Sequence, residues 1–214
     1  MRARWPSPNS TSAIMVKSVF LVFFSLAVTN HSLGQFSFKD DGTNARIQSG
    51  AMEAIDKKFH LQKDNEFELR LFIFPKWTDD NEGLSIFILT FKTGEWKARL
   101  FRNAWSTGKS QEIQLKPDRL DSLWKELDKN NVLNIPLAQE LVDKNGETLI
   151  DQLQGDDNSV FYSFELLNKN AVRHYAYKCP TEFSRRYDDI PTLKSVSIIV
   201  QLILNICQLE KMNC

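Results

Sequence analysis

Two strand-like stretches joined by a tight-turn signal constrain the fold of this chain more than any other feature. Residues 84–91 are mostly apolar and residues 96–102 alternate in hydropathy, and a two-residue loop at Thr93-Gly94 between them fits an antiparallel β-hairpin. Pairing Lys92 with Glu95 makes one face wholly apolar and the other mixed. A shift of one residue would scramble that segregation, so the pattern itself supports the register. The apolar face then comprises Phe87, Leu89, Phe91, Trp96, Ala98 and Leu100.

Two further regions carry strand patterns. Residues 66–74 alternate and end at Pro75, which predicts a strand preceding the hairpin. Residues 160–167 and 171–179 flank an Asn-Lys-Asn sequence at 168–170 and predict a second hairpin. The sheet is therefore expected to combine a three-stranded meander with a hairpin.

Helical spacing occurs in two long segments. Pro117-Asp118 opens the first helix, and the second covers residues 192–209, where the polar residues form a single stripe. This second segment is shorter than the roughly 20 apolar residues of a membrane span, so it is expected to be a largely buried core helix. The residues that define the two patterns are Leu120, Leu123, Trp124 and Leu127, and Lys194, Ser197, Gln201, Asn205 and Gln208.

This order of elements predicts an α+β fold. We expect an antiparallel sheet of about five strands with two main helices packed on one face. Residues 66–214 form the single globular domain, which is expected to be a monomer. Residues 35–65 are a poorly determined lead-in with weak helical spacing at Met52, Ile55 and Phe59.

The N-terminal segment has the layout of a secretory signal peptide. Residues 1–34 hold three basic residues and no acidic one, and an apolar run over 19–28 follows Lys17. We expect translation from Met15 and cleavage after Gly34. No cysteine lies nearby to receive a lipid, so the chain is predicted to be secreted or periplasmic, neither a lipoprotein nor membrane-anchored after cleavage.

Composition excludes several classes of protein. The 214 residues balance 27 basic against 27 acidic side chains, which gives no electrostatic case for binding nucleic acid. No cofactor motif is present. Two histidines remain after the signal, His60 and His174, too few in any ligand spacing for a zinc site, so no metal is expected.

One polar group is a candidate for catalysis. In the second hairpin, a three-residue loop would place Glu165 opposite Arg173, and a two-residue loop would place it opposite His174. Glu165 and His174 are weak candidates for an acid/base pair, with Cys179 as the nucleophile of a hydrolase. The favoured interpretation is a cross-strand ion pair.

Three cysteines permit one disulfide and leave one thiol over. Cys179 with Cys207 is the first expectation, because Cys207 lies on the last helix, which is expected to cover the strand ending at Cys179. Cys179 with Cys214 is the second. Three unpaired thiols remain an alternative.

The function predicted from these features is binding. We expect an exported, non-enzymatic domain that binds a protein or another envelope component through the mixed face of the sheet. A hydrolase using Glu165 and His174, or a secreted inhibitor of another enzyme, are the alternatives. The binding residues expected on the mixed face are Glu68, Arg70, Phe72, Lys97, Arg99 and Phe101.

Overall fold

The computed structural model describes only part of the chain. Described are residues 36–40, 57, 65–75, 83–102, 111–143, 145–149, 153 and 159–209. The chain divides into the units Met1–Ser37 and Phe38–Cys214. The expected signal segment, with Met15 and Gly34, lies outside the described residues, as does most of the lead-in. The fold below is that of the larger unit.

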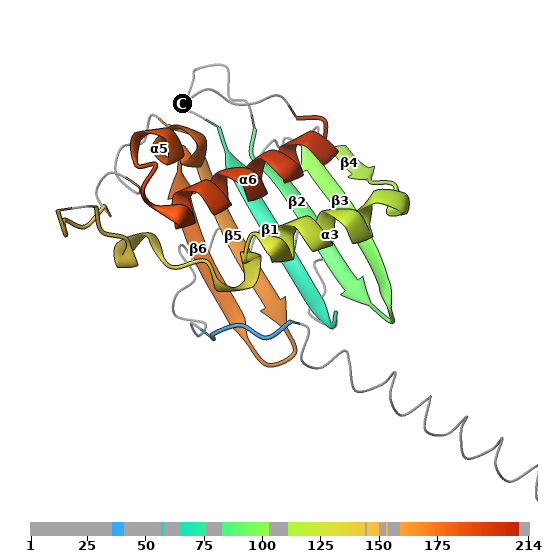
Figure 1. Cartoon of the computed structure of the whole chain (residues 1–214). Helices are drawn as coiled ribbons and strands as arrows, with labels where there is room; N and C mark the ends of the chain where they lie inside the picture. The colour runs from blue at the N-terminus through green and yellow to red at the C-terminus, as the bar shows by residue number, and fades with distance from the viewer. Residues whose placement is uncertain are drawn as a thin grey trace, which may run out of the picture. The chain divides into compact units, whose positions relative to one another are not determined.

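Six strands form one open sheet in which every neighbouring pair is antiparallel (Figure 1). The order across the sheet is β4-β3-β2-β1-β5-β6, so the predicted meander and hairpin meet where β1 pairs with β5. The strands are β1 (Phe67–Phe74), β2 (Ser85–Lys92), β3 (Glu95–Arg102), β4 (Gln111–Gln114), β5 (Phe161–Asn168) and β6 (Val172–Lys178). The short, polar β4 was not predicted, because four mostly exposed residues carry no alternating apolar signal.

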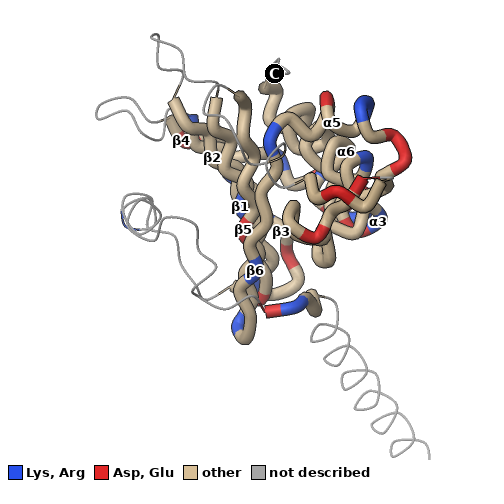
Figure 2. The backbone as a smooth tube through the Cα atoms, turned by 90° about the vertical axis from the view of Figure 1, so that its left-hand side faces the viewer, with Lys and Arg blue, Asp and Glu red and all other residues tan. Residues whose placement is uncertain are grey.

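Helices cover one face of this sheet. Figure 2 views the sheet from its edge and shows α3, α5 and α6 on the same side. The α+β prediction is therefore confirmed at the level of an antiparallel sheet with helices. The described α-helices are α3 (Leu120–Lys129), α5 (Pro180–Arg186) and α6 (Pro191–Ile206), and the short 3₁₀ helices are η2 (Pro117–Arg119), η3 (Val132–Asn134) and η4 (Ala138–Glu140). Helix α5 was not predicted, and its seven residues give too short a pattern to recognise from periodicity.

The predicted register of the first hairpin is confirmed. Lys92 pairs with Glu95 and Phe91 with Trp96. The loop residues Thr93 and Gly94 have φ of 53° and 82°, the positive values that a two-residue type I′ loop requires.

Replacing Gly94 by alanine is expected to destabilise the domain by about 1 kcal/mol, because a Cβ is strained at positive φ. No neighbouring atom lies within 4 Å of the position that this Cβ would take, so backbone conformation alone sets the effect. Thr93→Asn should shift stability the other way, since asparagine tolerates this region better than a β-branched residue. Urea unfolding measures both, and an unchanged midpoint for Gly94→Ala would contradict the expectation.

The face beneath the helices is the main core. All four residues predicted for the inner face of α3 are buried, and Trp124 stacks on Trp96 of β3 with ring centroids 4.9 Å apart. Phe67 of β1 meets Trp124 edge-on at 5.1 Å. The predicted polar stripe of α6 is partly enclosed: Ser197 is buried and its hydroxyl bonds to that of Thr181 in α5.

The opposite face of the sheet is buried as well over much of its area. A second apolar cluster consists of Phe72, Leu84, Ile86, Ile88 and Phe101, and Phe74 packs against it. Strand β1 is thus enclosed on both faces, although its sequence alternates between apolar and charged residues.

Candidate functional site

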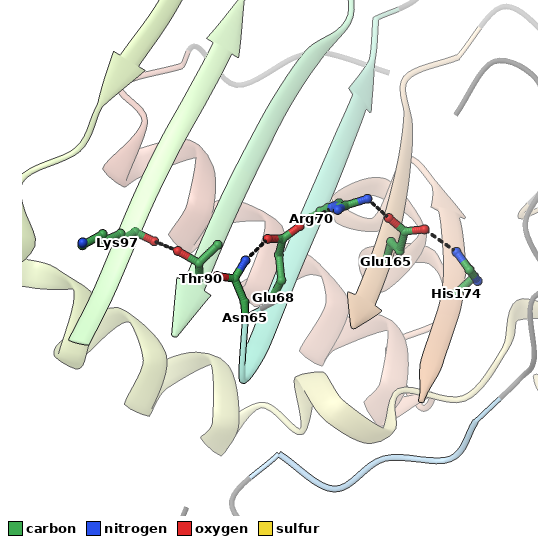
Figure 3. Close-up of polar contacts among 7 residues, drawn as sticks. All are labelled: Asn65, Glu68, Arg70, Thr90, Lys97, Glu165 and His174. Carbon is green, nitrogen blue, oxygen red and sulfur yellow. Dashed lines mark hydrogen bonds and ion pairs between the residues drawn. The ribbon is translucent and has the colours of Figure 1, made fainter. Parts of the chain in front are cut away.

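A row of charged side chains crosses the buried second face at β1, β5 and β6. Arg70 of β1 lies directly opposite Glu165 of β5, and Glu165 lies opposite His174 of β6. Glu68 shares this face with Arg70, because side chains two residues apart on a strand point the same way. Figure 3 shows the resulting cluster of Glu68, Arg70, Glu165 and His174, which we call the ion cluster.

Short contacts connect all four members of the ion cluster. The Arg70 guanidinium is fully buried, with Nε 2.5 Å from Oε1 of Glu68 and Nη1 2.7 Å from Oε2 of Glu165. His174 Nε2 lies 2.8 Å from Oε1 of Glu165. Asn65 donates from Nδ2 to the other oxygen of Glu68 at 2.6 Å. The arginine therefore bridges two buried carboxylates that would repel each other without it.

The contact between Glu165 and His174 resolves the two loop alternatives. Asn168 caps the turn through its side-chain Oδ1, which accepts hydrogen bonds from the backbone N–H groups of Asn170 and Ala171. The loop has two residues, so Glu165 pairs with His174 and not with Arg173. Arg173 points to the helix side instead and donates to the carbonyl of Ile135 at 2.7 Å.

This arrangement occupies the groups that acid/base catalysis would use. Both carboxylate oxygens of Glu165 are engaged, one by Arg70 and one by His174. The residue is fully buried, and His174 is nearly so. A carboxylate held by a buried guanidinium is stabilised in its charged form. The geometry is that of a structural ion network joining three strands.

Burial controls the acidity of Glu68. Desolvation raises the pKa of this carboxyl above its ordinary value of 4.5, although the charges of Arg70 and Arg99 and the hydrogen bonds from Arg70 and Asn65 act to lower it. The folded chain therefore binds a proton at Glu68 more readily than the unfolded chain does.

Stability should accordingly fall as pH rises through the window above 4.5, because the folded state must release a proton that it holds more tightly than the unfolded state. Glu68→Gln removes the titrating carboxyl group, so the variant lacks this contribution to the pH dependence. The free energy of unfolding of the native chain minus that of the variant is expected to be largest at acid pH and to decline toward neutrality. Urea titrations across this range measure the difference, and an increase with pH would refute the direction.

The mixed face expected to bind a partner is open only in part. Four of its six predicted residues, Glu68, Arg70, Phe72 and Phe101, are buried. Lys97 is exposed and Arg99 is partly exposed. The expectation of an open face is therefore wrong for the four buried residues. Phe72 and Phe101 join the second apolar cluster, and Arg70 is neutralised by carboxylates on β1 and β5.

The first expectation for the disulfide is also wrong. Cys207 is a free, buried thiol, so it does not bond to Cys179. Cys179 is itself disulfide-bonded, to a partner outside the described residues. It cannot serve as a thiol nucleophile, and the hydrolase that uses Cys179 loses its reacting group.

The Cys207 thiol should be almost inert in the folded protein. Burial raises its pKa from 9.0 to about 12, which lowers the thiolate fraction at neutral pH about a thousandfold. Alkylation by iodoacetamide, followed by mass spectrometry, is expected to be at least that much slower in the native state than in denaturant. Rapid native-state alkylation of Cys207 would contradict the burial.

Neither metal ligation nor known relatives add to this description. In the described ranges, no group of three or more His, Cys, Asp or Glu is placed to hold a metal ion. Within the same part of the chain, no helix has the length and hydropathy needed to cross a membrane. No protein-family model matches the chain, and a search of curated proteins finds no match.

The ion cluster combines residues that the sequence placed in separate groups. Glu68 and Arg70 were expected on a binding face, and Glu165 and His174 in a hairpin pair. Asn65 and the pairing of Arg70 with Glu165 were missed. The available signal was the presence of charged residues inside two largely apolar strands, two in β1 and one in β5, since such charges are rarely buried without partners.

Proposed function

We propose that the chain is an exported, non-enzymatic domain, periplasmic or secreted, that acts as a monomer and binds a protein or another envelope component. The acid-free N-terminal segment with its apolar run supports export. The disulfide-bonded state of Cys179 supports it too, because disulfides persist mainly in oxidising compartments.

The observation that carries the binding proposal is a charged corner of the mixed face that stays accessible. We define the β3–β4 corner as Lys97, Arg99, Glu112 and Gln114. Lys97 is exposed, and the side chains of Arg99 and Glu112 keep 27% and 45% exposure. Gln114 lies opposite Arg99 in the sheet and is exposed.

The ion pair within this corner is loosely made. Arg99 Nη1 lies 3.7 Å from Glu112 Oε1, and exposed pairs of this kind contribute about 0–1 kcal/mol. The Arg99 guanidinium also lies 5.3 Å from the Phe101 ring centroid, which orients it on a rigid strand. Such charges can exchange one partner for another at little cost, and charge complementarity steers association.

Charge reversal in the β3–β4 corner tests the proposal. Cross-linking in the envelope fraction of the native host, followed by mass spectrometry, should identify a partner of the native chain that Lys97→Glu/Arg99→Glu loses. Lys129→Glu is the matched control, because Lys129 is an exposed lysine on the helix side, in α3. A partner retained equally by both variants would remove the corner from the proposal.

A hydrolase using Glu165 and His174 without Cys179 is the second candidate, and the 2.8 Å contact between these residues is the observation that favours it. His174→Gln would abolish ester or amide hydrolysis if this were correct. We expect the native chain and the variant to release product from a panel of such substrates at the same background rate.

A further inference from the structure

The two edge strands of the sheet differ in how far they are covered. Within the described sheet, the strand order leaves β4 and β6 with one neighbour each (Figure 1). The five central residues of β6 are buried, and Asp40 accepts the backbone N–H of Val172 at its start, at 3.0 Å. In β4, by contrast, three of the four residues are exposed and the other, Ile113, is half-buried. Strand β4 is therefore the edge that faces solvent.

The hydrogen-bond pattern fixes which main-chain groups of β4 point outward. The Leu115 N–H donates to the Ala98 carbonyl of β3 at 3.0 Å. Backbone bonding alternates along an antiparallel strand, so Ile113 also bonds to β3. The N–H and C=O groups of Glu112 and Gln114 must then point away from β3. In the part of the chain that the structure describes, no hydrogen bond reaches these outward groups.

These outward groups match what an added strand needs. Two donors and two acceptors stand on alternate residues, and an extended chain running antiparallel to β4 would pair with them through two of its own alternate residues. Proteins often block such edges with proline or with a covering segment. Strand β4 contains no proline, and its exposure shows that it is not covered. The edge is thus able to take a further strand.

The side chains along this edge select by charge. Glu112 and Gln114 share the mixed face with Arg99, which lies opposite Gln114. Lys97 precedes Arg99 by two residues and is exposed on the same face. Lys116, also exposed, follows β4 with an extended backbone. Three basic side chains and one acidic side chain therefore border the edge, which favours an acidic partner.

We propose that the β4 edge binds an extended, acidic segment of a partner protein as an additional antiparallel strand. This rests on the proposed binding function of the β3–β4 corner, and it names the kind of partner.

The sheet register sets the pattern of this segment. Its residue opposite Gln114 is acidic and lies about 10 Å from Arg99 at the usual strand spacing, which a carboxylate and a guanidinium side chain bridge. It replaces Glu112, whose contact with Arg99 is 3.7 Å long. A second acidic residue lies beside Lys116, and a basic one opposite Glu112. The residue between the latter two faces Ile113 on the helix side and is apolar.

A designed peptide tests this pattern. The probe is Thr-Glu-Val-Glu-Val-Lys-Thr with blocked ends, whose glutamates would lie beside Lys116 and Gln114 and whose lysine would lie opposite Glu112. Titrated into the isotope-labelled full chain, it should cause saturable shifts of the Glu112 and Gln114 amide resonances. The same peptide with Glu and Lys exchanged should bind at least about tenfold more weakly, because three charge pairs become like-charged. Absence of saturable shifts in β4, or equal binding of the two peptides, would overturn the proposal.

N-methylated peptides test the main-chain pairing without changing the protein. Methylating the two glutamate nitrogens removes N–H groups that face β4, and binding should be lost. Methylating the two valine nitrogens removes N–H groups that face away, and binding should persist. Equal effects of the two modifications would refute strand addition. Shifts in β4 that depend on protein concentration without peptide would assign the edge to a second copy of the chain and would also overturn the proposal.

A proline variant extends the test to the native partner. Gln114→Pro removes an outward N–H and spares the bonds to β3, a position that edge strands tolerate. It should abolish peptide binding while the amide spectrum of the other strands is kept, and Lys125→Ala on the helix side should bind as the native chain does. In the native host, a partner lost by Lys97→Glu/Arg99→Glu but kept by Gln114→Pro would refute strand addition alone. A partner kept by both would refute the proposed function of the corner.

Discussion

Replacing Arg70 by alanine is expected to destabilise the domain by about 3–5 kcal/mol, because removing one partner of a buried ion network leaves the others uncompensated. Glu68 and Glu165 would then lie buried with no guanidinium between them. Urea unfolding followed by circular dichroism measures the loss. Arg99→Ala is the matched control: its pair with Glu112 is partly exposed, so its loss should stay under about 1 kcal/mol.

A compensated variant separates the charge effect from the packing effect. Arg70→Met combined with Glu68→Met and Glu165→Met replaces all three buried charges by apolar side chains of similar volume, so most of the stability should return. If Arg70→Ala alone costs less than about 1 kcal/mol, the ion cluster is not the structural network that its distances indicate.

The second large effect is expected at Trp124. This residue is the aromatic anchor of α3: it stacks on Trp96 and meets Phe67 edge-on. Truncating a buried tryptophan to alanine removes its contacts and leaves a cavity, which costs about 3–5 kcal/mol. Trp124→Ala should therefore shift the urea midpoint strongly and weaken the near-ultraviolet circular dichroism of the aromatic cluster.

The neighbouring residue provides the control for this prediction. Lys125 is exposed on the same helix, and Lys125→Ala should change stability by less than about 0.5 kcal/mol. Equal effects of the two variants would show that α3 contributes helix propensity alone and does not anchor the sheet.

Elements whose signal lies within a few neighbouring residues of the sequence were predicted well. The hairpin at Thr93-Gly94 was recovered with its register, because loop length and the alternation of the flanking residues both act over a few positions. The inner face of α3 was recovered for the same reason, since four apolar residues at helical spacing have one way to be buried together. The loop of the second hairpin stayed open between two lengths, because Asn168, Lys169 and Asn170 fit both.

The candidate site could not be assembled from the sequence, because it depends on contacts between distant segments. Arg70 and Glu165 are 95 residues apart and meet through the pairing of β1 with β5. Alternation showed that Arg70 and Phe72 share a face, but not that this face would be buried. The pattern of a mixed strand face is the same whether its charges bind a partner or one another.

The sequence by itself determined the five longer strands and the two longer helices, where the first hairpin turns, and which side chains share a face, because side-chain periodicity and turn conformation are local properties. Only the tertiary structure decided that β1 lies at the centre of the sheet, that Glu165 neutralises Arg70, and that Cys207 at the end of α6 lies beside Arg102 of β3. These outcomes depend on strand order and on the direction of a helix across the sheet. Both are set by the burial of residues far apart in the chain, which no short pattern records.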